Sequence, residues 1–475
     1  MIPPIKFSLV AALAAGGLAG CAVGPDYRRP EIAVSEKWVG PVSNAEVDGA
    51  WWRKFDDPLL TELVKAAILG NKDLAEASAR LREARANREA VLGRELPQAT
   101  ASAIATENRL SENGQLPVGK VPGLGPELSI FDTGFDASWE IDLWGGTRRA
   151  IESAEARADA AEEARRAVVM QVIGEVVRSY IDLRTAQALK ANAAHDARAQ
   201  AEIARLIADR LRVGLASRVD LMRAETQVRG SVAAIPAFES EAAAASFRLS
   251  LLVGQQPEVL DPRLREPGQL PAADVEIAAG LRSDLLRRRP DIRQAERDLA
   301  ASTAEVGVAT AELFPRFSLI GGIGLQARTL GDLHSSDSLR LQLGPSLRWP
   351  IFSGGRIRAQ IRAADARADG AKARYERAVL SALSDSETSI SRYISAGTIQ
   401  QERAAALAAA AEAVELMRRR YVAGEEDLTG LLQAQLAFSA ADRLHLQARA
   451  ARLRQFAALY KALGGGWEAA EAGSF

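Results

Sequence analysis

The residue with the clearest reactive chemistry is Cys21, the one cysteine of the chain. It follows the small residues Ala19 and Gly20, at the end of an apolar stretch over residues 7–20 that begins after Lys6. This stretch is too short to cross a bilayer and has the length of a signal-peptide core. The pattern predicts a lipoprotein signal over residues 1–20, cleaved so that Cys21 becomes the lipid-bearing first residue. The alternative is a chance cysteine near a plain cleavage site.

The residue after the cysteine bears on the membrane to which a lipoprotein is sorted. Ala22 stands where an Asp would resemble an inner-membrane retention signal. We therefore expect the protein in the bacterial outer membrane, lipid-anchored at Cys21. A single cysteine permits no disulfide within one chain, so stability must come from packing or oligomerisation.

Other patterns that resemble functional motifs are weak. Residues 322–327 (GIGLQA) fit the dinucleotide-binding pattern, but Gly331 and Asp332 follow where a helix should begin, which favours a glycine-bearing strand. The basic run Arg287–Arg289 is short and typical of a solvated helix face. The three histidines are far apart, with no metal-ligand spacing: His195, His334 and His445. The sequence predicts no enzyme, no cofactor and no metal site.

Composition indicates long helices. Aromatic residues are only 5% of the chain, and Ala, Arg and Glu dominate its middle, which favours closely packed helices over a thick aromatic core. The net charge of −1 offers no basic face for nucleic acid, and charges of both signs are mixed along the helices.

Two segments alternate apolar and polar residues, as β-strands with two different faces do. The apolar positions are Phe131, Phe135, Ala137, Trp139, Ile141 and Leu143, then Leu339, Leu341, Leu343, Leu347, Trp349 and Ile351. Weaker strands, residues 98–108 and 317–326, precede them across turn-rich loops, which predicts hairpins at about 97–143 and 316–352. Beyond Cys21 no run of 18 apolar residues occurs, so any membrane span must be β.

The two hairpins belong to an internal duplication. Residues 138–148 (SWEIDLWGGTR) align with residues 346–356 (SLRWPIFSGGR), 208 residues later. A long proline-free stretch with heptad spacing follows each hairpin, residues 146–213 and 356–423, and each would reach about 100 Å as one helix. Glycine then ends each helix, and return helices follow at about 217–252 and 428–463.

The sequence therefore predicts a mainly α fold with a transmembrane β part. We expect a lipid-anchored N-terminal segment with a first short helix (21–70), a first repeat (71–253, tip about 213–217), a connector (254–289), a second repeat (290–463, tip about 422–427) and a tail (464–475). We expect residues 254–271 to be irregular and the tail to be loose. Four strands cannot close a barrel and open edges are not tolerated in lipid, so several copies must share one barrel.

Several motifs carry a resemblance to a known family. They are Trp51-Trp52, residues 55–59 (FDDPL), 142–146 (DLWGG), 283–292 (SDLLRRRPDI) and 349–356 (WPIFSGGR). On these, the chain resembles the TolC-like outer-membrane factors, especially the OprM-like lipoproteins of resistance-nodulation-division efflux pumps, over residues 21 to 463. The resemblance implies a homotrimer with a 12-stranded β-barrel on a periplasmic α-helical barrel, and thus a large periplasmic part. It also implies two partners, a periplasmic adaptor and an inner-membrane transporter, with this chain as the passive conduit.

The resemblance also assigns roles to the two tips. The motif implies adaptor contact by Val213, Gly214, Leu215 and Ser217, and by Val422 and Gly424 of the second tip. It implies a periplasmic gate that includes Asp220 and Tyr421. A purely structural explanation exists for each of two residues. Gly214 would end a helix at a position that needs positive φ, and Asp220 would be an acid favoured by the helix dipole.

The second tip departs from the family pattern. Gly430 and Gln433 stand where relatives often carry acids, while Glu425, Glu426 and Asp427 are displaced into the turn. Glu426 occupies a position often held by a latching Arg. We therefore expect a gate whose narrowest point is polar, at Gln433, with the acidic ring further out.

Three other functions compete with the conduit. A structural envelope lipoprotein acting as a helical spacer would not need the amphipathic strands. A periplasmic adaptor should contain Gly-Val-rich lipoyl-like segments, and none is visible. An envelope hydrolase would need a nucleophile constellation, which the sequence lacks.

Overall fold

The computed structural model describes residues 22–35, 37–43, 45, 47–111, 126–272 and 278–471. The predicted signal peptide and Cys21 lie outside them. The chain divides into two compact units. Unit 1 comprises the N-terminal segment to Pro30 with Leu81–Ala160 and Ala295–Tyr375, and unit 2 comprises Glu31–Arg80, Ala161–Gln294 and Glu376–Phe475. Among the described helices, none combines the length and the apolar character needed to cross a membrane.

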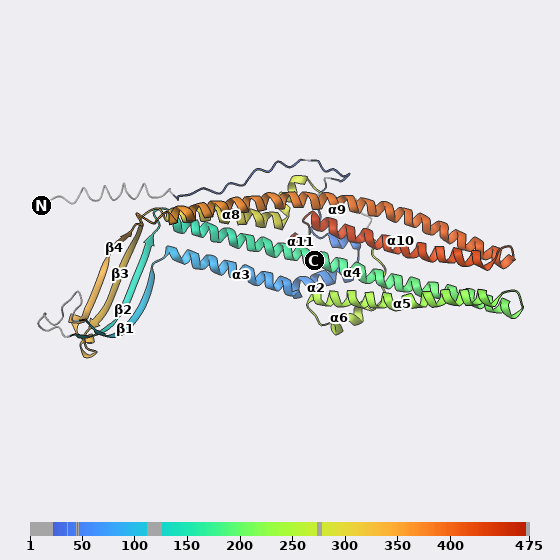
Figure 1. Cartoon of the computed structure of the whole chain (residues 1–475), viewed down its shortest axis with the longest axis horizontal. Helices are drawn as coiled ribbons and strands as arrows, with labels where there is room; N and C mark the ends of the chain where they lie inside the picture. The colour runs from blue at the N-terminus through green and yellow to red at the C-terminus, as the bar shows by residue number, and fades with distance from the viewer. Residues whose placement is uncertain are drawn as a thin grey trace. The chain divides into compact units, whose positions relative to one another are not determined.

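Unit 1 holds a four-stranded antiparallel sheet in the order β1-β2-β3-β4 (Figure 1). The strands are β1 (Gln98–Arg109), β2 (Glu127–Ile141), β3 (Arg316–Ala327) and β4 (Leu339–Arg348). The two predicted hairpins are confirmed, and β2 also pairs with β3, which joins them into one sheet. The duplicated halves therefore meet along the β2–β3 ladder.

The sheet has one apolar and one polar face. Phe135 lies opposite Ala101 and Ile323, and Ile323 lies opposite Leu341, so these residues form one row on one face. Leu341 and Leu343 are 73% and 76% exposed, so this row belongs to a contiguous exposed apolar patch, which is uncommon on a soluble monomer. The alternate residues, on the other face, are polar or glycine on β4 and from Asp132 onward on β2, including Asp132, Asp136, Arg340 and Gln342. Leu128 and Ile130 also lie on this face, at the loop end of β2.

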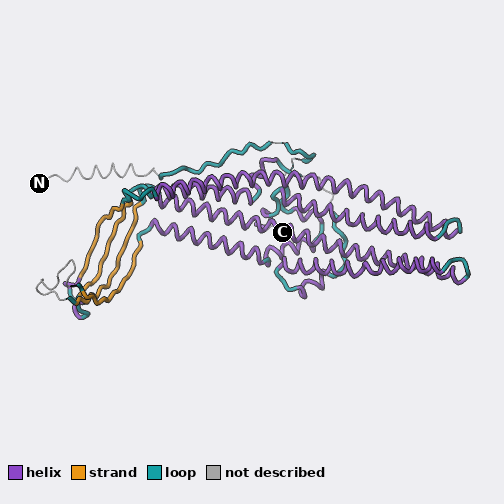
Figure 2. The backbone as a smooth tube through the Cα atoms, in the orientation of Figure 1, coloured by secondary structure: helices purple, strands orange, loops and turns teal. Residues whose placement is uncertain are grey.

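Each of the two long stretches that the sequence predicted to be helical forms one continuous helix (Figure 2). The long helices are α4 (Gly146–Arg212) and α9 (Arg356–Ala423), with return helices α5 (Arg218–Val253) and α10 (Leu428–Ala462). The others are α2 (Pro58–Gly70), α3 (Lys72–Leu92), α6 (Pro257–Leu264), α7 (Leu285–Arg288), α8 (Pro290–Ala311) and α11 (Trp467–Glu471). The fold class of long antiparallel helices with four strands is confirmed.

The core of unit 2 is aromatic at its centre. The short 3-10 helix Trp51–Phe55 buries its rings against α10, where Trp51 stacks on Tyr460 at 5.6 Å between ring centroids. Phe55 meets Phe456 edge to face at 5.3 Å. Valines and isoleucines of α4, spaced three and four apart, cover this cluster: Val169, Val172, Ile173, Val176, Val177 and Ile181.

Three local expectations were wrong. The basic run Arg287–Arg289 does not lie entirely on a solvated helix face, because Arg289 is buried and donates to the Ala462 carbonyl at 3.0 Å. Residues 254–271 are not irregular throughout, because Pro257 opens α6 with the backbone angle that a first helical turn requires. The tail is not loose over residues 467–471, which form α11. The Trp467 indole donates to the Arg288 carbonyl at 3.0 Å, and Glu471 pairs with Arg166 at 2.9 Å, so polar contacts hold this short helix.

Candidate functional sites at the helix tips and on the sheet

The first tip is a tight turn between α4 and α5. Gly214 has a φ of 79°, and its N–H donates to the Leu211 carbonyl while the Leu215 N–H donates to the Arg210 carbonyl. This pair of bonds is the Schellman ending, which places glycine at its positive-φ residue. Val213 and Leu215 are 70% and 75% exposed. The turn thus presents two apolar side chains to solvent.

Asp220 stabilises the start of α5. Ser217 caps the helix, since its hydroxyl accepts the Asp220 N–H at 3.1 Å, and the Asp220 carboxylate accepts the Ser217 N–H at 3.0 Å. The Ser217 hydroxyl also donates to this carboxylate at 2.7 Å. These hydrogen bonds hold the pKa of the Asp220 carboxyl below its ordinary value. All three hydrogen bonds of Asp220 therefore lie within the first turn of α5.

The second tip has the same backbone and different side chains. Gly424 has a φ of 80°, the Glu425 N–H donates to the Arg420 carbonyl, and Asp427 caps α10 by accepting the Gly430 N–H at 2.9 Å. Arg420 pairs with Glu426 at 2.9 Å and with Glu425 at 3.7 Å. The two acids of the turn are therefore partly neutralised by the preceding helix.

Tyr421 is the residue that connects the two tips. It is 3% exposed, and the Arg210 guanidinium of α4 lies 4.2 Å from the centroid of its ring. Arg210 Nη2 also donates to the Tyr421 carbonyl at 3.2 Å. A guanidinium on an aromatic face gains electrostatic attraction to the ring. The link thus uses the ring face and the backbone.

The structure brings some predicted site residues together and leaves others apart. Tyr421 approaches α4, whereas Asp220 bonds to the cap of its own helix and Gln433 is exposed. Val422 is 66% exposed at the second tip. The sequence interpretation missed Arg210 and Arg420. Their signal was present, because each stands four residues before its tip glycine.

Two tryptophans lie on the apolar side where strands meet helices. The Trp139 indole donates to the Glu95 carbonyl at 2.8 Å, and the Trp349 indole donates to the Leu313 carbonyl at 3.1 Å. Ile351 and Phe352, just after β4, are 84% and 92% exposed. Aromatic rings with one satisfied polar atom are typical of a membrane–water interface.

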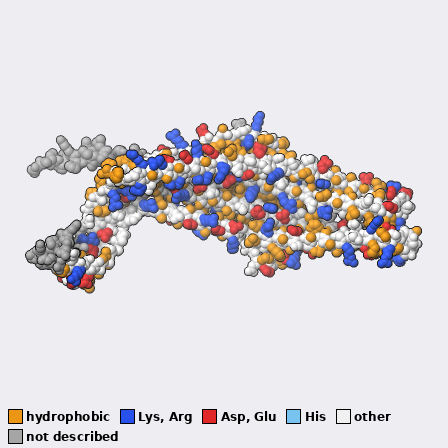
Figure 3. All heavy atoms as spheres, viewed as in Figure 1, with side chains coloured by type: hydrophobic (Ala, Val, Ile, Leu, Met, Phe, Trp, Pro, Cys, Tyr) orange, Lys and Arg blue, Asp and Glu red, His pale blue; other side chains and the backbone are white. Residues whose placement is uncertain are grey.

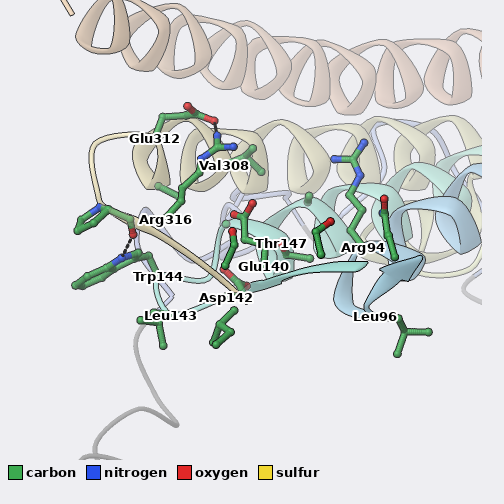
Figure 4. A pocket seen from close by; sticks show the side chains of 18 residues that line it. Arg94, Leu96, Glu140, Asp142, Leu143, Trp144, Thr147, Val308, Glu312 and Arg316 are labelled. Atoms are coloured by element: carbon green, nitrogen blue, oxygen red, sulfur yellow. Dashed lines mark hydrogen bonds and ion pairs between the residues drawn. The ribbon is translucent and has the colours of Figure 1, made fainter. Parts of the chain in front are cut away.

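The polar face of the sheet ends in a hollow of about 410 Å³ (Figure 4). Its lining includes Arg94, Glu140 and Arg316, and Figure 4 shows Arg316 paired with Glu312. Trp144 closes one side by donating its indole N–H to the Pro315 carbonyl at 2.8 Å. The hollow is charged with both signs and thus suits a water-filled passage better than an apolar ligand.

The segment that follows the predicted lipid site is fixed against this junction. The Val23 N–H donates to the Trp144 carbonyl at 3.0 Å, and Ala22 packs on Gly145. Arg149, whose side chain is 4% exposed, donates to the Val23 carbonyl at 3.2 Å and pairs with Asp26 at 2.6 Å. Residue 22 therefore lies where the strands turn into helices.

Metal-ligand sets and surface charge are two further features of the described residues. No group of three His, Cys, Asp or Glu in the described ranges could hold a metal ion. Figure 3 shows acidic and basic side chains interspersed along the helices on the face it presents. A mixed surface of this kind is typical of a solvated helical wall.

Comparison with known proteins places these features in a family context. Residues 63–255 and 281–465 match the family model described as "Outer membrane efflux protein". Nodulation protein T of Rhizobium leguminosarum bv. trifolii is 31% identical over 95% of both chains, and the pyoverdine export outer membrane protein OpmQ of Pseudomonas aeruginosa is also 31% identical over 95% of both. The solved outer-membrane channel OprN is 37% identical, with a TM-score of 0.87 over 94% of this chain and 100% of that one.

Proposed function

The chain belongs to the outer membrane efflux protein family, and on this premise we propose that it is the outer-membrane conduit of a tripartite efflux pump. The observation that carries the proposal is the sheet with a largely exposed leucine face and an opposite polar face. Lipid outside and water inside a barrel wall would satisfy both faces. Solutes would cross passively, and neither the family description nor the names of OpmQ and OprN is that of an enzyme.

The proposed pore is shared by three copies of the chain. Within the described residues, β1 and β4 each pair on one side only, so the sheet has two open edges. An open edge in lipid leaves backbone N–H and C=O groups without partners, at a cost of several kcal/mol for each. Joining β4 of one copy to β1 of the next removes both edges, and three copies make a barrel of twelve strands.

The proposed anchor is an acyl group on Cys21. Ala22 and Val23 are bound where β2 turns into α4, and the exposed pair Ile351 and Phe352 lies at the corresponding turn from β4 into α9. A lipid on the preceding residue would therefore lie at the helix end of the strands, where a membrane leaflet would meet the periplasm. Incorporation of labelled palmitate should be lost in Cys21→Ala, and incorporation that persists in this variant would refute the anchor.

The tips are the proposed contact with a periplasmic adaptor, and through it with an inner-membrane resistance-nodulation-division transporter. Val213, Leu215 and Val422 are exposed on tight, hydrogen-bonded turns, which suits docking of another helical hairpin. Leu215→Ser should weaken capture of the adaptor while leaving the unfolding midpoint unchanged. Leu69→Ser, at another exposed leucine far from the tips, serves as the control.

We propose that the gate depends on the Arg210–Tyr421 contact, with Asp220 holding the start of α5 in place. Glu425 and Glu426, paired with Arg420, and Asp427 would form the outer acidic ring, and Gln433 the polar inner one. Losing the cation–π contact should loosen one tip hairpin from the other.

The experiment that tests the conduit is solute release from liposomes by protein extracted from outer membranes. The particle should have three times the mass of the 50.8 kDa chain, apart from the removed signal and added lipid. Liposomes containing it should release small solutes faster than liposomes containing an unrelated lipoprotein. A monomeric particle that releases nothing would support the spacer alternative instead.

A further inference from the structure

One arginine crosses an entire strand on the polar face of the sheet. Arg340 of β4 lies opposite Gly324 of β3, and Gly324 lies opposite Gly134 of β2. The arginine side chain therefore extends over two residues that have no side chains. Its Nη2 lies 3.2 Å from Asp132 Oδ1 and its Nη1 lies 3.5 Å from Asp136 Oδ1. Strands are about 4.8 Å apart, so the side chain spans two strand spacings.

The glycines are what permit this crossing. A Cβ on Gly322 would come within 2.6 Å of Asp136 Oδ1, and a Cβ on Gly324 would come within 2.5 Å of the Thr133 carbonyl oxygen. Gly322 and Gly324, which fit the dinucleotide-binding pattern in the sequence, thus form the floor of an ion-pair cluster.

The three charged groups differ in exposure. The Asp132 side chain is 17% exposed and accepts a further hydrogen bond from Gln326 at 2.6 Å, whereas the Asp136 side chain is 52% exposed. Two carboxylates against one guanidinium leave one negative charge. Arg340 and Asp132 form the closer and less exposed ion pair. The excess negative charge therefore lies on Asp136, which is exposed on the polar face.

The position of the cluster within the strands is also defined. Arg340 is the second residue of β4, and Asp132 is the sixth residue of β2, so both lie in the half of the sheet nearer to the hairpin loops. Charges nearer the helices are of both signs, including Glu140, Arg316 and Arg348, and Arg316 is paired with Glu312. The polar face therefore has a negative band toward the loops, whereas its charges toward the helices are mixed.

We propose that Asp132, Asp136 and Arg340 form a charge-selectivity element of the pore, with Asp136 facing the permeating ions and Arg340 setting the strength of the negative band. The proposal rests on the conduit function, in which the polar face lines the lumen. Three copies would place three such clusters around the pore. A ring of carboxylates makes an entrance favour cations.

The test is the reversal potential of the channel in a potassium chloride gradient across a planar bilayer. Asp136→Asn should shift the permeability ratio toward chloride, and Arg340→Gln should shift it toward potassium. Each shift should be about two- to fivefold, since one charge a few Å from an ion in water changes its local concentration by roughly that factor. Arg340→Lys keeps the charge and should leave the ratio near that of the wild type.

The controls separate charge from packing. Glu107→Gln removes an exposed acid from the opposite face of the same sheet and should not shift the ratio. A purely structural ion pair would lower stability in Arg340→Gln without producing shifts of opposite sign, and that result would overturn the inference. If Arg340→Gln does not assemble, Asp136→Asn alone decides, and an unchanged ratio overturns the proposal. Absence of conductance both in the wild type and in Arg210→Ala, which removes the tip contact, would contradict the conduit function itself.

Discussion

At the residue scale, the two tip glycines are required by backbone geometry. Gly214 has a φ of 79°, and a Cβ added to it would meet nothing within 4 Å, so strain and not crowding opposes any side chain there. Gly214→Ala should lower the free energy of unfolding by about 1 kcal/mol. Gly230→Ala, in the middle of α5 with equal space around it, should raise it by up to about 1 kcal/mol. Denaturant unfolding of both variants checks the sign, and equal effects would contradict this account of the turn.

His445 makes stability depend on pH. Burial is the main cause that lowers its pKa, nearby Arg449 adds to it, and Asp442 opposes it. Because the folded pKa lies below the unfolded value, the unfolded chain binds the proton first. The stabilising effect of a neutral His445 is full above about pH 6.5 and declines as pH falls from there toward the folded pKa. His445→Gln should flatten the decline in unfolding midpoint between about pH 7.5 and about pH 5.5. A slope identical to the wild type would exclude this histidine as its source.

Sequence could anticipate the tip glycines and not the contacts around them. Gly214 and Gly424 stand at helix ends where only glycine adopts the needed φ without strain, so their role follows from residue type alone. The contact of Arg210 with Tyr421 joins residues 211 positions apart, and no local pattern shows which face of a long helix meets another. The assigned gate and adaptor roles stay predictions.

At the element scale, β4 is an amphipathic strand whose two faces should respond oppositely to the same charge. Leu341→Arg places a charge on the proposed lipid face and should cost about 2–4 kcal/mol near the bilayer midplane. Gln342→Arg, one residue later and on the polar face, should be tolerated. The fraction of trimer in outer-membrane extracts measures both effects. Equal loss in both variants would contradict the assignment of faces.

The short helix α11 is an element that the sequence did not reveal. Five residues cannot show a helical period, and the contacts that stabilise α11 come from distant segments. Trp467 lies between Arg166 and Arg293, whose guanidinium carbons are 4.7 Å and 5.6 Å from its ring centroid. The strands and long helices were predictable because their periods repeat many times.

Trp467 provides a test of that short helix. Trp467→Ala should lower the free energy of unfolding by about 1–3 kcal/mol, through lost burial and cation–π attraction. Trp467→Phe keeps a ring between the two arginines and loses only the bond to the Arg288 carbonyl, so its effect should be smaller. Thermal unfolding of the two variants compares them. Equal losses would mean that the hydrogen bond, and not the ring, holds α11.

At the scale of the whole molecule, the duplication explains why one chain cannot close the proposed β-barrel by itself. Each half supplies two strands, and the halves join along β2 and β3, which leaves β1 and β4 as open edges within the described residues. Sequence alone could show that four strands do not close a barrel. The number of copies could not be deduced from periodicity, because a closed barrel of eight or more strands satisfies the same rule.

The most direct test of the conduit is the single-channel current through the purified, lipidated protein in a planar bilayer. The wild type should show discrete conductance steps, and Arg210→Ala, which removes the contact with Tyr421, should enlarge them. The particle mass and the acylation of the same sample are measured first, to verify that it consists of lipidated trimers. A verified trimer that passes no current, both as wild type and as Arg210→Ala, would contradict the account.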